Sequence, residues 1–191
     1  MKLPATFYQR ENTQQIAKDL LGKSLCTNIH RKTTKAIITE TEAYAGITDK
    51  ASHAYGDKRT KRTEPMYGPG GHAYVYLCYG IHHLFNVVTN IEGIPHAILI
   101  RAGIPKTGEP TMLRRRGKTR GDKSLLAGPG SLAKALGITT PMTAADLTGN
   151  RIWIEDNGFE VKKSNITVGP RVGVDYAGED AARPYRFILK L

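Results

Sequence analysis

The chain has 191 residues, of which 40% are hydrophobic, so it is long enough to bury a core and short enough to form one domain. Its 28 Lys and Arg residues outnumber its 17 Asp and Glu residues, and the formal net charge of +11 predicts an acidic partner. That partner can be nucleic acid, an anionic membrane surface or a polyphosphate, and a basic protein with a merely solvated surface has the same balance. No apolar run reaches the roughly 20 residues that cross a bilayer, and the N-terminus lacks the apolar core of a signal peptide. We therefore expect a cytoplasmic protein without a membrane partner.

The first elements expected along the chain are a helix and two strands. Asn12 and Gln15 resemble the capping box that begins a helix, and Gly22 can end this helix in a left-handed conformation. Residues 24–28 form a short expected strand, and residues 34–44 form a longer one that is rich in β-branched side chains.

The longer strand carries acidic side chains at regular spacing. If the strand is regular, one of its faces holds Ile38, Glu40, Glu42 and Tyr44. An apolar core would not accept that face, which must therefore meet solvent, a polar cleft or a ligand. A carboxylate beside an aromatic ring in a positive protein suits an enzyme that holds a polyanion and does acid–base chemistry on one aromatic unit of it.

A long loop and three short strands follow. The loop spans residues 45–71 and contains the basic cluster 58–62, and loops of this length are usually functional or disordered. The strands are expected at residues 74–79, 84–90 and 96–101. Because short turns connect them, we expect an antiparallel and strongly curved sheet.

The C-terminal half begins with a polar, basic stretch at residues 101–123 that is typical of a mobile surface loop. A helix is expected at residues 131–136, where Gly137 ends it, and a further helical turn at residues 143–146. The last expected strands are residues 152–154 and 185–189. The pattern predicts an α+β fold: a single domain with a curved, mainly antiparallel β-sheet flanked by short helices.

Metal and cofactor motifs are absent from the sequence. The six histidines show no ligand spacing such as HxxxH or HxH, so we expect no metal site. Cys26 and Cys78 are far apart in apolar contexts, which predicts two buried thiols. No P-loop and no GxSxG elbow is present. We expect no organic cofactor either.

Tyrosine is the over-used aromatic residue, with nine copies against four Phe and one Trp. Each tyrosine alone is typical of a half-buried sheet position, but together they supply stacking surfaces for a nucleic-acid base. Those that fall in one third of the chain are Tyr44, Tyr55, Tyr67, Tyr74, Tyr76 and Tyr79.

Several segments in order resemble the alkyladenine type of 3-methyladenine DNA glycosylase. The resemblance is carried by residues 38–44, His53, residues 74–80, Asn86 and Arg101, and it runs from about Leu3 to Phe187. Further matching segments are residues 20–23, 126–132 and 171–174. The resemblance implies one DNA glycosylase domain over residues 1–191 that acts in base excision repair on double-stranded DNA.

The resemblance also implies a role for each matching residue. Glu42 would activate the water that attacks C1′ of the deoxyribose, and Arg101 would help to fix that water and a nearby phosphate. Tyr44 and Tyr76 would stack on the flipped base, and His53 would close the pocket and contact the base edge. These roles give a slot for one purine with a general base beside it.

Two further positions would contact the duplex and the base. Tyr79 would fill the gap left in the duplex, which requires a sharp turn at Tyr79 and Gly80 because Tyr76 and Tyr79 face opposite sides of a regular strand. Asn86 would press on the minor-groove side of the base and disfavour the guanine amino group. With no lysine in these motifs to form a Schiff base, the implied product is an abasic site.

The implied substrates are alkylated purines, with 3-methyladenine and 7-methylguanine first. Alkylation makes these bases cationic, so they leave readily and bind well to a tyrosine face. The resemblance also leaves hypoxanthine and ethenoadenine open as substrates, and these neutral bases need protonation by a group that the sequence does not identify. A monomer is expected, because a duplex-binding face of this kind needs no dimer.

The residues alone leave other interpretations open. Glu42 can be a surface-strand carboxylate paired with Lys35 or Arg59, and Glu40 competes with it as the base on geometry. The charge and the tyrosines also fit a non-catalytic protein that binds structured RNA. A hydrolase of a small nucleotide or nucleoside is a third reading, which requires neither a wedge nor a basic loop.

Overall fold

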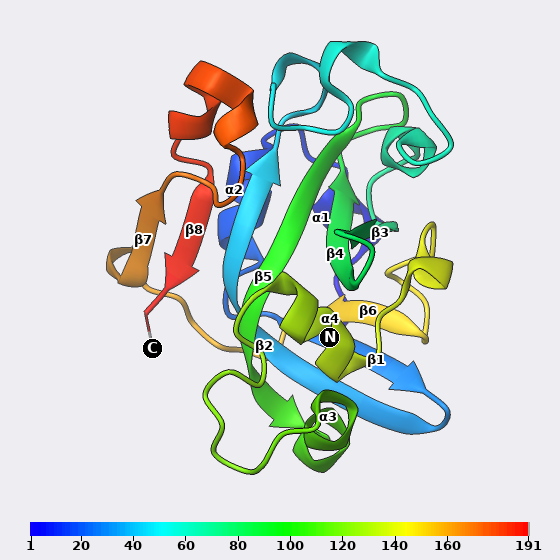
Figure 1. Cartoon of the computed structure of the whole chain (residues 1–191), viewed down its shortest axis with the longest axis vertical. Helices are drawn as coiled ribbons and strands as arrows, with labels where there is room; N and C mark the ends of the chain where they lie inside the picture. The colour runs from blue at the N-terminus through cyan, green and yellow to red at the C-terminus, as the bar shows by residue number, and fades with distance from the viewer. Residues whose placement is uncertain (191) are drawn as a thin grey trace.

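The computed structural model describes residues 1–190, and a curved sheet of antiparallel strand pairs forms its centre (Figure 1). The strands run in the order β3-β4-β5-β2-β1-β6, and β8 pairs with β2 and β7 beside this path. The long strands β2 and β5 cross the centre of Figure 1, with β7 and β8 at one edge and β3 and β4 at the other. The strands are β1 Ser24–Ile29, β2 Lys32–Tyr44, β3 Ala73–Cys78, β4 His82–Thr89, β5 His96–Thr107, β6 Ile152–Glu155, β7 Ile166–Gly169 and β8 Arg186–Leu189. The predicted α+β class and curved, mainly antiparallel sheet are confirmed.

Short helices accompany the sheet. The second begins as the sequence predicted, because the side chain of Asn12 accepts a hydrogen bond of 2.9 Å from the backbone N–H of Gln15. The chain leaves this helical region at Gly22, which has a φ of 78°. The α-helices are α1 Ala5–Tyr8, α2 Thr13–Asp19, α3 Glu109–Arg116 and α4 Pro129–Leu136. The 3-10 helices are η1 Gly46–Thr48, η2 Tyr55–Asp57, η3 Glu64–Tyr67, η4 Thr140–Met142, η5 Lys163–Asn165 and η6 Asp175–Ala182.

The basic stretch at residues 101–123 is ordered structure over most of its length, so the prediction of one mobile loop was wrong. Strand β5 continues to Thr107, and helix α3 begins two residues later. Gly108 and Gly117 bound this helix with φ values of 78° and 63°, and buried Met112 anchors it to the core. Met112 and its half-buried neighbour Leu113 are the apolar contacts of this helix, and the three arginines that follow them obscure this short apolar pattern in the sequence.

Two smaller expectations also differ from the structure, and one strand was not expected. The helical turn expected at residues 143–146 occurs earlier, at η4, because Pro141 suits a first helical turn and Ala144 takes a positive φ of 64°. Cys26 is buried as predicted, whereas Cys78 near the end of β3 is only half-buried. Strand β7 carries no clear alternation, and the sequence analysis did not predict it.

The core lies where the sheet meets α2 and α4. A single apolar cluster includes Ile16 and Leu20 around α2, Ile38 on β2, Ile98 on β5 and Leu132 on α4. These positions have no exposed surface. Their burial accounts for how the central strands are held in place.

A bulge in the β2–β5 pair decides which side chains leave the core. Ile38 pairs with Gly103, and Glu40 pairs with Ala102, so the step between these pairs is two residues on β2 and one on β5. Ile38 points into the core, and Glu40 interacts on the opposite side. The expectation that Ile38 shares the acidic face was wrong because the bulge breaks the period of two.

Candidate active site

Glu42 lies at the centre of the candidate site, and its side chain is fully buried. The backbone N–H of Val172 donates a hydrogen bond of 2.8 Å to its Oε1 atom. The hydroxyl of Tyr44 donates a hydrogen bond of 2.8 Å to Oε2, and the Nε atom of Arg101 lies 3.4 Å from Oε1. Donors on both oxygens hold this carboxyl group in one orientation.

Burial raises the pKa of Glu42 above its ordinary value, although Arg101, the Val172 N–H and the Tyr44 hydroxyl act in the opposite direction. Burial outweighs these groups because the carboxyl has lost its contact with water. A raised pKa makes the carboxylate a stronger base than an exposed one.

The sheet register brings the slot residues into one row. Leu99 on β5 pairs with Glu42 on one side and with Asn86 on the other. Asn86 also pairs with Tyr74 on β3. Paired residues of neighbouring strands point to the same face, and Tyr76 shares the face of Tyr74 because it lies two positions further along.

The side chains on this face line a small cavity of about 20 Å³. The rings of His53 and Tyr76 meet edge to face, with centroids 4.7 Å apart and an angle of 80° between the planes. A cavity of this volume holds about one water molecule, so a purine enters this slot only after side chains move. The cavity is lined by Tyr44, Ala51, His53, Met66, Tyr74, Tyr76, Asn86 and Ala97.

His53 is held on both ring nitrogens. Its Nδ1 atom lies 2.9 Å from the Tyr74 hydroxyl, and its Nε2 atom lies 3.2 Å from Nη2 of Arg62. Because a guanidinium only donates, Nε2 accepts and Nδ1 carries the proton. Burial, followed by the charges of Arg62 and Lys58, lowers the pKa of His53 to about 4, so the ring is neutral at pH 7.

The ring of Tyr44 packs against Arg171, which forms a buried ion pair with Asp49. The guanidinium of Arg171 lies 4.8 Å from the Tyr44 ring centroid and donates a hydrogen bond of 2.8 Å to Asp49 Oδ1. Arg171 also donates to the carbonyl of Ala43 at 2.9 Å. Burial, followed by the charge of Glu42, raises the pKa of Tyr44, so its hydroxyl keeps the proton that it donates to Glu42.

Glu40, the geometric competitor of Glu42, has different partners. Its Oε1 atom accepts from Nε of Arg101 at 2.8 Å and from Nε of Arg186 at 2.6 Å. Only Glu42 is hydrogen-bonded to a tyrosine of the slot. The surface pairs considered for Glu42 do not form, because Lys35 binds Glu155 at 2.6 Å and Arg59 pairs with Asp57 at 3.9 Å.

Tyr79 lies apart from the slot, at the turn between β3 and β4. Tyr79 and Gly80 have φ values of 51° and 72°, and the N–H of Ile81 donates to the carbonyl of Cys78 at 3.2 Å. Two successive positive φ values are typical of a type I′ turn. The turn leaves Tyr79 90% exposed, with exposed Leu77 and Ile81 beside it.

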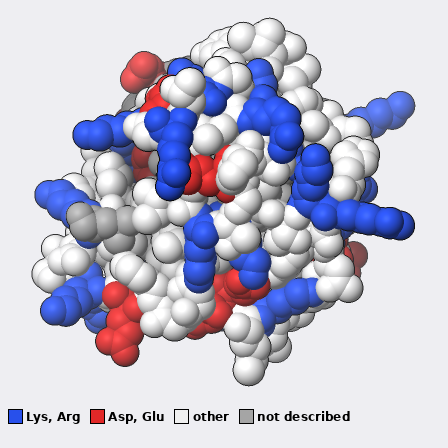
Figure 2. Space-filling view, turned by 90° about the horizontal axis from the view of Figure 1, so that it is seen from below, with Lys and Arg blue, Asp and Glu red and all other residues white. Residues whose placement is uncertain are grey.

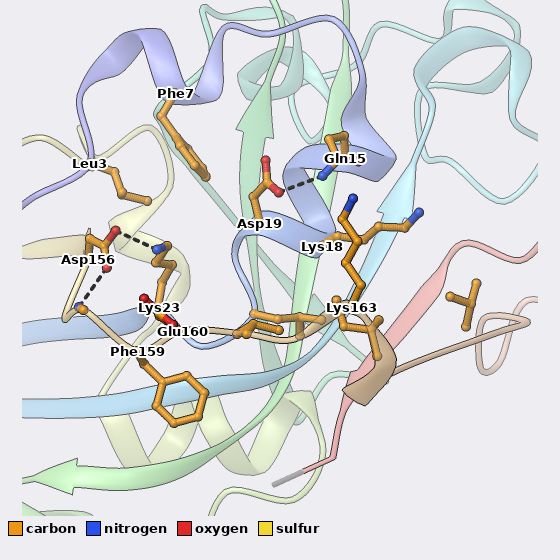
Figure 3. Close-up of a pocket in the computed structure, with 15 residues that line it drawn as sticks. Leu3, Phe7, Gln15, Lys18, Asp19, Lys23, Asp156, Phe159, Glu160 and Lys163 are labelled. Atoms are coloured by element: carbon orange, nitrogen blue, oxygen red, sulfur yellow. Dashed lines mark hydrogen bonds and ion pairs between the residues drawn. The ribbon is translucent and has the colours of Figure 1, made fainter.

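A much larger cavity, of about 890 Å³, lies elsewhere (Figure 3). It is formed by α1, α2 and the segment from Asp156 to Val168, and it combines apolar side chains with lysines. Lys23 pairs there with Asp156 at 2.6 Å, and Gln15 donates to Asp19 at 2.7 Å. None of the site residues predicted from the sequence lines this cavity. Size alone therefore does not locate the site.

Positive charge is spread widely over the surface. Figure 2 shows Lys and Arg side chains, interrupted by acidic areas, over the end of the molecule where α3 lies in Figure 1. The loop of residues 45–71, which contains the basic cluster 58–62, lies at the other end of the molecule, so basic residues do not gather on one end alone. Within residues 1–190, no group of three or more His, Cys, Asp or Glu side chains is placed to hold a metal ion. The helices of the same part of the chain are all too short or too polar to cross a bilayer.

The sequence analysis assigned no role to several residues that shape the site. Arg171 and Val172 belong to a segment that it recognised, but it gave them no function. Asp49 and Arg171 are 122 positions apart, and no local pattern connects them. Arg62 was seen only as part of a basic cluster.

Comparison with known proteins identifies the family of this chain. The family model described as methylpurine-DNA glycosylase matches residues 6–191. Relatives with the name "Putative 3-methyladenine DNA glycosylase" include a Chlamydia felis protein, 46% identical over 99% of this chain and 96% of its own length. Others are a Methanocella arvoryzae protein, 47% identical over 98% and 92%, and a Desulfitobacterium hafniense protein, 43% identical over 99% and 95%. This chain therefore belongs to the methylpurine-DNA glycosylase family and is a DNA glycosylase.

Proposed function

We propose that this protein is a monofunctional glycosylase that flips an alkylated purine out of duplex DNA and hydrolyses its N-glycosidic bond. The observation that carries the proposal is the buried carboxylate of Glu42, which is bonded to Tyr44 at the edge of the aromatic slot and lies beside Arg101. A fixed base next to a pocket for an aromatic ring is what hydrolysis of a flipped nucleotide requires.

In the proposed reaction, a water molecule attacks C1′ and its proton passes to the carboxylate of Glu42. The bond between C1′ and the purine nitrogen breaks, and its electron pair leaves with the base. The products are a free purine and an abasic sugar that carries a hydroxyl group at C1′. The negative charge of Glu42 also stabilises the positive charge that develops on the sugar.

The slot favours purines that are already cationic. A cation binds to the face of a tyrosine with about 0.5–2 kcal/mol, and Tyr44 and Tyr76 line the slot on which the base would stack. We therefore propose 3-methyladenine and 7-methylguanine as the main substrates. Hypoxanthine and ethenoadenine are neutral and would react more slowly. The pKa of His53 is lowered to about 4, so the ring is already neutral at pH 7 and has no imidazolium proton to give to the base.

The remaining predicted residues complete the proposal. Asn86 is buried, and its Nδ2 atom donates to the Tyr74 carbonyl at 3.1 Å, so it forms a rigid wall against which the base edge would rest. Exposed Tyr79 would insert into the duplex. No lysine lines the slot, so we expect no Schiff base and no strand cleavage. The enzyme would act as a monomer in base excision repair.

The proposal is tested by incubating the protein with methylated duplex DNA, methylated RNA and the nucleoside 7-methylguanosine. We expect release of free 3-methyladenine and 7-methylguanine from the duplex, with abasic sites and no nicks. Binding of RNA without base release would favour a non-catalytic binder. Faster cleavage of the nucleoside than of the duplex would favour a nucleoside hydrolase, and either result contradicts the proposal.

A further inference from the structure

Arg62 contacts two residues that line the slot, His53 and Tyr76, but does not line the slot itself. It lies in the exposed segment between η2 and η3, and its guanidinium carbon is 4.9 Å from the centroid of Tyr76. Its Nη2 atom is 3.2 Å from Nε2 of His53. One cation therefore touches both side chains whose rings meet edge to face at the slot.

An open cleft of about 310 Å³ lies on the side of Arg62. The cleft and the small slot share Tyr74 and Tyr76 as walls, while Arg62 lines only the cleft. An exposed guanidinium at the edge of such a cleft is free to exchange its partners for a phosphate, which it binds better than a neutral ring. The other residues of the cleft are Lys61, Val75, Leu77, Thr140 and Thr143.

The charge of Arg62 also opposes the proposed substrate. A cationic purine would stack on Tyr76, whose ring already carries a guanidinium. Two cations at one aromatic ring repel each other, and each weakens the cation–π interaction of the other. Entry of an alkylated base is therefore favoured when Arg62 leaves.

We propose that Arg62 is a latch that keeps the base slot closed in the free enzyme and is released by a phosphate of the bound duplex. The inference rests on the proposed function, and it makes access to the slot depend on DNA. A free base encounters a slot that Arg62 keeps closed, whereas a base in a duplex arrives with phosphates, one of which binds Arg62 and draws it away from the slot. The latch thereby limits inhibition by released product.

The matched control is Arg59, which belongs to the same segment. Its guanidinium carbon lies 3.9 Å from the centroid of Tyr67, a ring that does not line the slot. Arg59→Ala therefore removes the same charge and the same kind of contact without touching the latch. Both side chains are exposed, so neither substitution is expected to disturb folding.

The first measurement is inhibition of base release by free 3-methyladenine. Arg62→Ala should bind this inhibitor about two- to fivefold more tightly than the wild type, which corresponds to one exposed cation–π contact. Arg59→Ala should match the wild type. In the same variants, the salt dependence of binding to damaged duplex should lose about one unit of slope in Arg62→Ala, because one phosphate contact is gone. Unchanged inhibition or an unchanged slope in Arg62→Ala overturns the latch.

A second measurement does not need activity. In an NMR titration, the pKa of His53 should be about 4 in the wild type and higher in Arg62→Ala, because the neighbouring cation has been removed. Arg59→Ala should leave it unchanged. If the wild type releases no base from methylated DNA, the proposed function fails while this titration still tests the latch. If base is released but His53 titrates alike in all three proteins, the latch fails alone.

Discussion

Replacement of Glu42 by Gln tests the proposed base with little change of shape. The amide oxygen can take the place of Oε1 and accept from the Val172 N–H, while the Tyr44 hydroxyl turns to accept from the new NH₂ group. Arg101 keeps its hydrogen bond of 2.8 Å to Glu40, so no buried cation is left without a partner. We therefore expect Glu42→Gln to fold and to bind damaged duplex.

The expected kinetic loss is large. General-base catalysis contributes about 10²- to 10⁴-fold to a rate, which corresponds to about 3–5 kcal/mol of activation free energy. Loss of the charge that stabilises the developing sugar cation adds to this. The assay is single-turnover release of 3-methyladenine with enzyme in excess, so that binding and product release do not mask the chemical step.

Glu40→Gln provides the comparison, because it removes the same charge on the same strand from a group without a hydrogen bond to the slot. We expect a smaller loss than in Glu42→Gln, caused only by a less well oriented Arg101. A Glu42→Gln rate within about tenfold of the wild type would refute the reasoning, since it lies below the usual range of base catalysis. So would an equal loss in both variants.

The remaining predictions concern pH, the duplex and stability. The single-turnover rate should rise with pH through a pKa above the ordinary carboxyl value of 4.5, because Glu42 must be ionised to act; an acid limb at or below 4.5 contradicts this. As pH rises through the same window, the wild type should lose stability relative to Glu42→Gln, since a raised folded-state pKa means that ionisation disfavours the folded state; denaturant titrations that remain parallel would exclude it. Tyr79→Ala should slow release from duplex more than from single-stranded DNA without lowering Tm, because the side chain of Tyr79 is 90% exposed; equal losses on both substrates argue against a wedge. Asp49→Asn should cost about 3–5 kcal/mol of unfolding free energy, because it leaves the guanidinium of Arg171 buried without its anion; a loss below about 1 kcal/mol in urea denaturation would show that the pair matters little.

The sequence predicted the parts of the fold that depend on local patterns. Alternation and β-branched residues located β2, and Asn12 located the start of α2. The bulge at Thr39 escaped prediction because neither Gly nor Pro marks it, and its effect on Ile38 depends on the register with β5. Helix α3 escaped because its arginines give no helical apolar period. That the whole chain forms one domain stays a prediction.

In the candidate site too, contacts between residues close in the sequence could be predicted and contacts between distant residues could not. Glu42 and Tyr44 are neighbours along one strand, so the sequence could pair them. The groups that tune them come from far along the chain, since Val172 is 130 positions from Glu42 and Arg171 is 122 from Asp49. Long-range contacts of this kind carry no signal in the spacing of residues within a single sequence.

Glu40 accepts hydrogen bonds from both Arg101 and Arg186, and together with the bulge this explains how Glu42 keeps a raised pKa although arginines lie nearby. A guanidinium placed squarely on Glu42 would favour its ionised form and weaken it as a base. Instead, Nε of Arg101 lies closer to Glu40, at 2.8 Å, than to Glu42, at 3.4 Å, and Arg186 also binds Glu40. Arg101 has no partner across the β2–β5 register, because the pairing passes from Ala102 directly to Ile100. Glu40 therefore takes the closer contact with Arg101, which still lies near enough to Glu42 to help orient a water or a phosphate beside the carboxylate that must accept the proton.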